Sequence, residues 1–205
     1  MSRPGKIVCV GRNYRGHARE MGNEVPKEPL LFLKPPSSVI PSGEPIVLPR
    51  ASRQVEYEGE IGVVIARRLH RATAEEARGA IAGVVAVNDV TARDLQRTDG
   101  QWTRAKGFDS FCPVGEGPVA VDDLGALEVI TRVNGAERQR GRASDMAFPI
   151  PDLLAYISRI MTLEPGDLIA TGTPAGVGPL APGDTVEVEI AGRSAVRNHV
   201  ISERD

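Results

Sequence analysis

Residues 55–65 read VEYEGEIGVVI, a stretch in which three glutamates alternate with other residues before an apolar run. Successive side chains of a β-strand point to opposite faces, so this spacing places Glu56, Glu58 and Glu60 on one face. The apolar half, Ile61 to Ile65, predicts that the strand becomes buried directly after the acids. Alternating acids are also common on solvated edge strands, and that is the alternative explanation of the pattern.

A second apolar run predicts another buried strand. Residues 80–87 read AIAGVVAV and are followed by Asn88 and Asp89. We expect an acid at the end of a buried strand to face a cleft. Glu58, Glu60 and Asp89 in one cleft would repel one another unless a cation lay between them, and carboxylate oxygens are ligands that Mg²⁺ and Mn²⁺ prefer. The residues therefore predict an acidic metal site, with Ca²⁺ as the other hard cation although no EF-hand spacing is present.

Composition narrows the class of protein. The chain has 205 residues, of which 41% are hydrophobic and 25% charged, so we expect one core and one domain spanning residues 1–205. The net charge is -2 and no basic block occurs, which argues against a nucleic-acid partner. The apolar runs are too short to cross a membrane, and the N-terminus predicts a strand rather than a signal peptide. We expect a cytoplasmic protein with Cys9 and Cys112 reduced and buried.

Short strands and turns dominate the remaining pattern. Thr73 and Glu76 form the spacing of a capping box, which predicts the start of a helix. Residues 101–112 are expected to form a loop. Because strands outnumber helices, the predicted fold class is α+β with a β-rich core. Further strands are expected near residues 6–11, 30–34, 46–48, 114–121, 128–134, 167–171, 185–190 and 195–200, and helices near 14–21, 74–81 and 152–161.

Several polar residues have spacings that suit chemistry. A short helix after Asp89 would place Asp89, Arg93 and Gln96 on one stripe. His17 and Glu20 lie at i and i+3 on a predicted helix, where they form either a surface ion pair or a general base whose ring is oriented by the carboxylate.

Two further features have an ordinary explanation and a functional one. Lys106 and Arg93 would be surface charges in isolation, but near a metal-bound anion they would hold its negative charge. Residues 171–178, TGTPAGVG, form either a plain glycine-rich turn or a backbone anion site, without the Gly-Lys-Ser/Thr of a P-loop. Lys34, before Pro35 and Pro36, is a weak signal.

Six segments taken together resemble the fumarylacetoacetate hydrolase family, in the short branch that lacks a separate N-terminal domain. The resemblance extends from about residue 7 to 200. The segments, in order, are GRNYRGHAREM at 11–21, FLKPPSS at 32–38, YEGE at 57–60, NDVTARD at 88–94, KGFD at 106–109 and TGTPAGVG at 171–178.

This resemblance implies a fold and a set of site residues. The fold would consist of mixed β-sheets rolled into a partly open barrel, usually in a homodimer. Glu56 does not belong to the family's ligand set. The implied roles are Mg²⁺ or Mn²⁺ on Glu58, Glu60 and Asp89, a water-activating pair of His17 and Glu20 on a mobile lid, enolate stabilisation by Lys106, and substrate binding by Arg93, Gln96 and Thr173.

The resemblance also implies 2-oxo acid substrates. His17 and Glu20 favour hydrolysis of the C–C bond of an acylpyruvate to pyruvate and a carboxylate. The alternatives are decarboxylation or tautomerisation of oxaloacetate, isomerisation or decarboxylation of an unsaturated 2-oxo dioate, and a metal-stabilised scaffold without catalysis. A glycosidase fits poorly, because one tryptophan and 4% aromatic residues leave little for sugar stacking.

Overall fold

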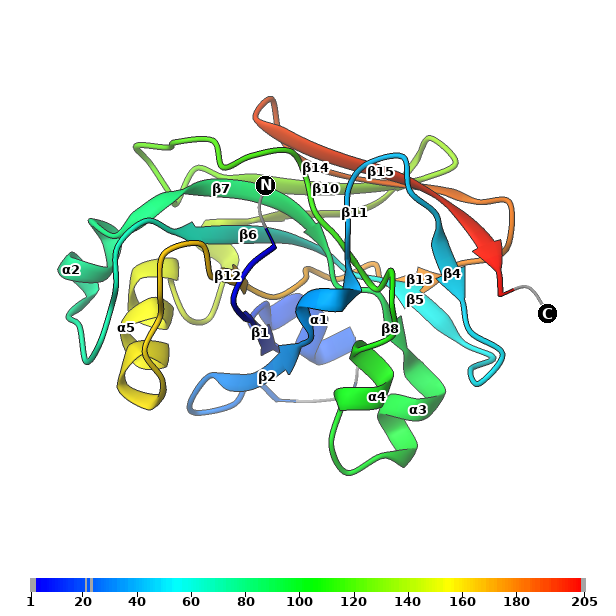
Figure 1. The fold of residues 1–205 in the computed structure, drawn as a ribbon, viewed down its shortest axis with the longest axis horizontal. Helices are drawn as coiled ribbons and strands as arrows, with labels where there is room; N and C mark the ends of the chain where they lie inside the picture. Colours follow the sequence, from blue (N-terminus) through cyan, green and yellow to red (C-terminus); the bar gives the residue numbers. More distant parts are fainter. Residues whose placement is uncertain (1–2, 21, 23, 204–205) are drawn as a thin grey trace.

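Two five-stranded sheets pack against each other in the computed structural model, which describes residues 3–20, 22 and 24–203 (Figure 1). The first sheet has the order β2 (Leu30–Lys34), β1 (Ile7–Gly11), β12 (Leu168–Ala170), β6 (Gly59–Ile65) and β7 (Ile81–Asn88). The second has the order β11 (Ala136–Arg142), β10 (Glu128–Val133), β14 (Thr185–Ile190), β15 (Ser194–Ser202) and β4 (Ile46–Leu48).

Two smaller sheets complete the strand-rich fold. One joins β13 (Gly178–Pro179), β5 (Val55–Tyr57) and β8 (Thr91–Ala92), and the other joins β3 (Val39–Ile40) to β9 (Cys112–Pro113). Pairing is mixed, since β1 runs parallel to β12 and antiparallel to β2. The described sheets do not close into a barrel. The expected α+β class with mixed, partly open sheets is confirmed.

The helices lie in two groups at opposite ends of the sheets, with α1 (Arg15–Glu20) between them (Figure 1). At one end α2 (Ala74–Arg78) packs on α5 (Ile150–Ile160), and at the other α3 (Arg93–Thr98) packs on α4 (Thr103–Lys106). Two 3-10 turns are η1 (Pro36–Ser38) and η2 (Ala143–Asp145). No described helix has the length and apolar character needed to cross a membrane.

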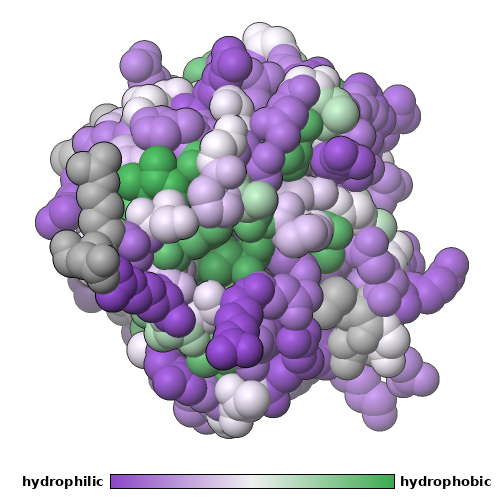
Figure 2. Space-filling model, turned by 90° about the vertical axis from the view of Figure 1, so that its right-hand side faces the viewer, coloured by the Kyte–Doolittle hydropathy of each residue, from purple (hydrophilic) through white to green (hydrophobic). Residues whose placement is uncertain are grey.

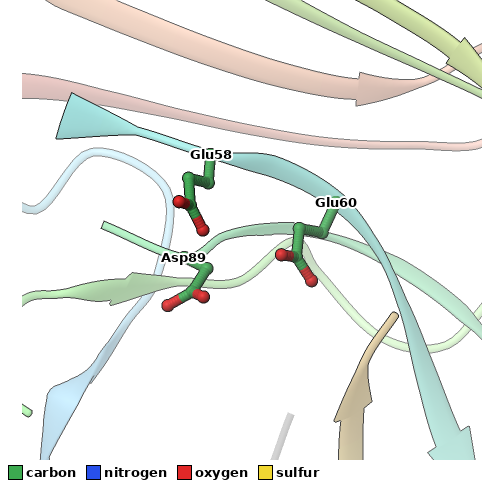
Figure 3. A group of neighbouring side chains, drawn as sticks. All are labelled: Glu58, Glu60 and Asp89. Atoms are coloured by element: carbon green, nitrogen blue, oxygen red, sulfur yellow. The ribbon is translucent and has the colours of Figure 1, made fainter. Parts of the chain in front are cut away.

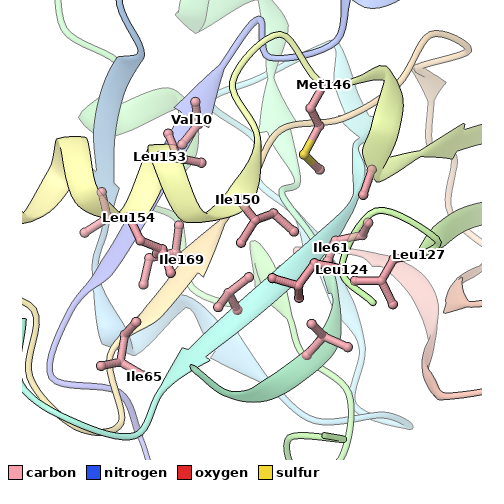
Figure 4. Packing of buried hydrophobic residues seen from close by; sticks show 14 of the residues in the cluster. Val10, Ile61, Ile65, Leu124, Leu127, Met146, Ile150, Leu153, Leu154 and Ile169 are labelled. Carbon is pink, nitrogen blue, oxygen red and sulfur yellow. The ribbon is translucent and has the colours of Figure 1, made fainter. Parts of the chain in front are cut away.

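The main core forms where α5 covers the first sheet. Ile150, Leu153 and Leu154 of α5 pack with Ile61 of β6 and Ile169 of β12, all at most 2% exposed (Figure 4). These residues are buried because α5 turns one apolar stripe toward the strands. Burial of apolar side chains is the main stabilising contribution to such a core. It holds β6 in place, and β6 carries one of the predicted site residues.

Strand β6 is an interior strand. It pairs with β12 on one side and β7 on the other, and Ile61 and Val63 are fully buried. The alternative explanation of the acids as a solvated edge strand is therefore wrong.

Other local expectations fail where long-range pairing intervenes. The expected strand over 55–65 divides at Glu58, because β5 pairs in the three-stranded sheet and β6 in the first five-stranded sheet. Residues 114–121 make isolated bridges to β7 rather than a long strand. Residues 101–112 contain α4, and β11 forms from a polar segment by pairing with β10.

The capping box at the start of α2 is confirmed. Thr73 Oγ1 accepts a hydrogen bond from the Glu76 N–H at 3.2 Å, and the Glu76 carboxylate accepts one from the Thr73 N–H at 2.8 Å. Cys9 and Cys112 are buried free thiols, as expected. Figure 2 shows that the face seen from the right of Figure 1 is mostly polar, with an apolar area near its centre.

Candidate functional site

The three predicted metal ligands lie together. Strand pairing places Gly59 opposite Asn88, so Glu58 and Glu60 at the start of β6 come beside Asp89, which follows β7. The Asp89 N–H donates to the Glu58 carbonyl at 2.8 Å. One carboxylate oxygen of each acid lies within 4.8 Å of the other two, and the three side chains gather on one side of the ribbon (Figure 3). Exposed fractions of 5%, 1% and 1% show that these acids are buried.

Two buried lysines bind this acidic cluster. Lys106 Nζ donates to Glu58 Oε2 at 2.8 Å and to Asp89 Oδ2 at 2.6 Å. Lys34 Nζ donates to Asp89 Oδ1 at 2.7 Å and to the Val90 carbonyl at 3.2 Å. The sequence interpretation gave Lys34 little weight. Its signal was a lysine at the end of an apolar strand, which is an expensive place for a cation without a partner.

Arg93 orders the neighbouring acids. Its Nε donates to Glu56 Oε2 at 2.8 Å, its Nη2 lies 2.5 Å from Glu58 Oε1, and its Nη1 donates to Gln96 Oε1 at 2.8 Å. The predicted stripe of Asp89, Arg93 and Gln96 is wrong, because α3 begins at Arg93 and Asp89 precedes it. Arg93 and Gln96 still meet, one helical turn apart.

The charges of the site differ in how well they are balanced. Burial opposes ionisation of Glu58, but Arg93 and Lys106 outweigh it and hold the pKa of Glu58 well below its usual value. Burial alone would lower the pKa of Lys106, but Asp89 and Glu58 raise it, so its ammonium form persists. Burial, and then the charges of Asp89 and Glu58, raise the pKa of Glu60 well above its usual value.

The Glu60 carboxylate is the part of the site that lacks a positively charged partner among the described residues and could bind a cation. In residues 3–20, 22 and 24–203 its carboxylate forms no ion pair, and it accepts a hydrogen bond from the Gly172 N–H at 2.8 Å. The four buried acids, Glu56 included, face three buried cations: Lys34, Arg93 and Lys106. A divalent cation with a preference for oxygen ligands would more than offset this excess of one negative charge. Glu58, Glu60 and Asp89 are the residues that could hold it.

His17 and Glu20 meet on α1 as predicted. His17 Nδ1 lies 3.2 Å from Glu20 Oε2, and His17 is 6% exposed. The Glu20 carboxylate also accepts the Gly176 N–H at 3.0 Å, which ties α1 to the glycine-rich loop. Gly176 has φ +100°, and a Cβ there would lie 2.1 Å from the Arg138 carbonyl oxygen, so only glycine fits.

Thr173 lines the cavity, and its hydroxyl is held by two protein partners. Its hydroxyl donates to the Gly59 carbonyl at 2.9 Å and accepts from Gln139 Nε2 at 2.8 Å. Gln139 Oε1 accepts the Gly59 N–H at 3.0 Å. A hydroxyl has one hydrogen, so in this arrangement Thr173 cannot also donate to a substrate through Oγ1. The sequence interpretation missed Gln139, which comes from the unpredicted strand β11.

These residues surround a cavity of about 310 Å³. Nζ of Lys106 lies 4.9 Å from the centre of the Phe32 ring, which packs edge-on against Trp102 at 5.3 Å. Two predicted residues, Glu20 and Asp89, are absent from the cavity wall but contact His17 and Lys106, which line it. The lining residues are Val10, Gly11, Arg12, His17, Phe32, Glu58, Glu60, Arg93, Gln96, Arg97, Trp102, Lys106 and Thr173.

Comparison with known proteins places the chain in a family. A family model described as fumarylacetoacetate (FAA) hydrolase C-terminal matches residues 6–201. The chain belongs to the fumarylacetoacetate hydrolase family. This confirms the resemblance carried by the six sequence segments.

Named relatives within the fumarylacetoacetate hydrolase family are enzymes. The mitochondrial oxaloacetate decarboxylase of Dictyostelium discoideum is 44% identical over 195 residues, covering 91% of this chain and 89% of that protein. The mitochondrial oxaloacetate tautomerase of Mus musculus is 43% identical over 197 residues, covering 93% and 89%. A crystal structure of 5-carboxymethyl-2-hydroxymuconate delta-isomerase from Mycobacterium smegmatis has a TM-score of 0.92 at 44% identity, covering 99% of this chain and 81% of that one.

Proposed function

We propose that this protein is a divalent-cation-dependent enzyme that enolises 2-oxo dioates, with oxaloacetate as the substrate. The observation that carries the proposal is the meeting of a protonated Lys106, an acidic cluster and the His17–Glu20 pair around one small cavity. The relatives named oxaloacetate decarboxylase and tautomerase support this choice over the acylpyruvate hydrolysis that the sequence favoured.

We further propose that the cation is Mg²⁺ or Mn²⁺, held by Glu58, Glu60 and Asp89. These are hard oxygen ligands of the kind that both ions prefer. When bound, such an ion supplies Lewis acidity toward the carboxylate and 2-oxo group of a 2-oxo acid.

Lys106 and Gln96 would bind the 2-oxo acid end of the substrate. The Lys106 ammonium donates a hydrogen bond to the C2 oxygen and stabilises the negative charge that develops there on enolisation. Gln96 uses its amide oxygen to accept from Arg93, which leaves its N–H groups for a substrate carboxylate. Arg93 itself is committed to Glu56 and Glu58 and holds the acidic cluster in position.

His17 would move the proton at C3. Its Nδ1 contacts Glu20, so Nε2 is the ring nitrogen that can take the proton and return it. The Gly176 N–H fixes the Glu20 carboxylate, which in turn orients the ring. Transfer of a proton between C3 and the C2 oxygen interconverts the keto and enol forms. Loss of C4 as CO₂ from the keto form instead leaves the enolate of pyruvate, whose charge on the C2 oxygen Lys106 would stabilise in the same way. Protonation of that enolate at C3 gives pyruvate, so decarboxylation is the related reaction.

The His17–Glu20 pair favours one second candidate, hydrolysis of an acylpyruvate. In that reaction His17 takes a proton from water, the resulting hydroxide attacks the C4 carbonyl, and cleavage of C3–C4 releases a carboxylate and the enol of pyruvate. The homodimer implied by the family resemblance stays a prediction.

The test follows enol-oxaloacetate, pyruvate and acetylpyruvate with Mg²⁺ or Mn²⁺, before and after EDTA. Cation-dependent loss of enol without pyruvate supports tautomerisation, and loss with pyruvate supports decarboxylation. Turnover of acetylpyruvate alone would transfer the assignment to the hydrolase. No cation-dependent turnover of either substrate would overturn the proposal.

A matched pair of variants tests the proton-transfer role. Glu20→Gln keeps an acceptor for the Gly176 N–H but removes the charge beside His17, so turnover should fall at least tenfold with the fold intact. Glu28→Ala, on an exposed residue outside the cavity, should leave turnover unchanged. Equal activity of both variants would remove the pair from the mechanism.

A further inference from the structure

Two arginines that the proposed reaction does not use line the same cavity. Arg12 is half-buried in the turn between β1 and α1, and Arg97 is exposed on α3. The acids that line the cavity, Glu58 and Glu60, are 5% and 1% exposed. The cavity therefore has an acidic, deeply buried floor and a cationic rim.

The rim arginines differ from the other cations in the availability of their donors. Arg93 and Lys106 bind the buried acids. In the described part of the chain, by contrast, the Arg12 guanidinium has no hydrogen-bond or ion-pair partner. Arg97 Nη2 donates to Gln54 Oε1 at 2.7 Å, and its other N–H groups are not needed for that contact. The rim thus offers a fork of donors without a protein acceptor, which suits a carboxylate.

The backbone at Arg12 is held in an unusual conformation. Its φ is +59°, in the left-handed region that arginine seldom adopts. Asn13 fixes the turn, since its Oδ1 accepts the Phe148 N–H at 2.9 Å and its Nδ2 donates to the Thr171 carbonyl at 2.8 Å. Gly11 packs close to Trp102, where a Cβ would lie 3.2 Å from the ring. Strain that the surroundings maintain beside a cavity is typical of a functional position.

We propose that Arg12, together with Arg97 of the same cavity, binds the carboxylate at the far end of a 2-oxo dioate. This inference rests on the proposed function for the near end, where the 2-oxo acid group meets the acidic floor. Arg12 is then a specificity-determining residue. It selects dicarboxylates over monocarboxylates by a charge-assisted, bidentate pair with the second carboxylate.

A stable ligand pair tests this selection without turnover. Malate and lactate share the 2-hydroxy acid end, and malate adds the distal carboxylate. Their affinities are measured by titration calorimetry on the Mg²⁺-loaded protein. Wild type should bind malate more tightly than lactate. Arg12→Gln should lower the affinity for malate by roughly 10- to 100-fold and leave the affinity for lactate unchanged. The oxaloacetate KM should rise by a similar factor, with kcat within about threefold.

Three controls distinguish this role from general effects. Arg19→Gln makes the same charge change on an exposed residue of α1 and should leave both affinities as in wild type. Arg12→Asn, whose backbone tolerates the left-handed region, should fold as well as wild type and lose the same selectivity. Arg12→Lys keeps the positive charge but loses the bidentate guanidinium. Its selectivity for malate over lactate should lie between those of wild type and Arg12→Gln.

The outcomes separate this inference from the proposed function. If Arg12→Gln loses malate selectivity but the wild-type protein does not turn over oxaloacetate, the role of Arg12 is supported and the proposed reaction is refuted. Equal weakening of malate and lactate in Arg12→Gln, no weakening of either, or a wild type that binds neither ligand would each overturn the inference.

Discussion

Replacing Lys34 by methionine removes one cation from the buried cluster and leaves Asp89 short of a partner. The Lys34 side chain is 0% exposed, and its Nζ donates to Asp89 Oδ1 at 2.7 Å. Removing one partner of a buried ion pair costs about 3–5 kcal/mol. Asp89 Oδ2 keeps its 2.6 Å contact with Lys106, so we expect a smaller cost than this range, about 2–3 kcal/mol. For a chain of this size that lowers Tm by roughly 4–12 °C.

The assay is urea unfolding of the metal-free protein at neutral pH, for Lys34→Met, Asp89→Asn and the double variant. In the Asp89→Asn background Lys34 has already lost its charged partner, so Lys34→Met removes an unpaired buried charge and should cost less than about 1 kcal/mol there. Arg68→Met is the matched control. It breaks an ion pair with Glu164 whose side chains are 67% and 52% exposed, and should change stability by at most about 1 kcal/mol. A cost of Lys34→Met that is equally small, or equal in both backgrounds, would refute the reasoning.

Three other predictions concern the site's frame, a helix end and the thiols. A Cβ at position 59 would lie 1.9 Å from the buried Thr131 Oγ1, so Gly59→Ala should destabilise by about 1–3 kcal/mol in urea unfolding, and adding Thr131→Ala should restore part of the loss. Thr73→Ala should cost about 1 kcal/mol in thermal unfolding by removing the cap of α2; no change would mean that the cap is dispensable. Burial, partly offset by Lys34 and augmented by Asp89, raises the pKa of Cys112 to about 12, and burial raises that of Cys9 well above its usual value. Both thiols should therefore resist a thiol reagent at pH 8 until urea unfolds the chain, and rapid labelling of the native protein would contradict this. Because the folded-state pKa values are the higher ones, the folded state holds these protons longer, so stability should fall as pH rises above about 8.5.

Parts of the fold follow from local sequence. The apolar runs at 61–65 and 81–87 form buried strands because their side chains are stable only when they are removed from water in a core. Thr73 and Glu76 start a helix because both partners of the cap lie within one turn. The meeting of Glu58, Glu60 and Asp89 was predictable as well, since acids at the ends of adjacent apolar strands share one edge of a sheet.

Other parts depended on pairing between distant segments. The strand that carries the acids divides at Glu58 because its two halves join different sheets, and alternation within eleven residues contains no sign of that. Strand β11 has almost no apolar residues and forms because β10 offers it a partner, so Gln139 and its contact with Thr173 were hidden from sequence patterns.

By itself, then, the sequence determined the strand-rich class, the acidic cluster, the His17–Glu20 pair and, through six ordered segments, the family. Only the tertiary structure decided what compensates each charge: Lys34 on Asp89, Arg93 on Glu56 and Glu58, and Glu60 without an ion-pair partner among the described residues. It also decided that Arg12 faces the cavity while Asp89 lies outside α3. The physical reason is that periodicity and capping act over a few residues, whereas a buried charge is stabilised by whichever distant side chain the fold brings within hydrogen-bonding distance.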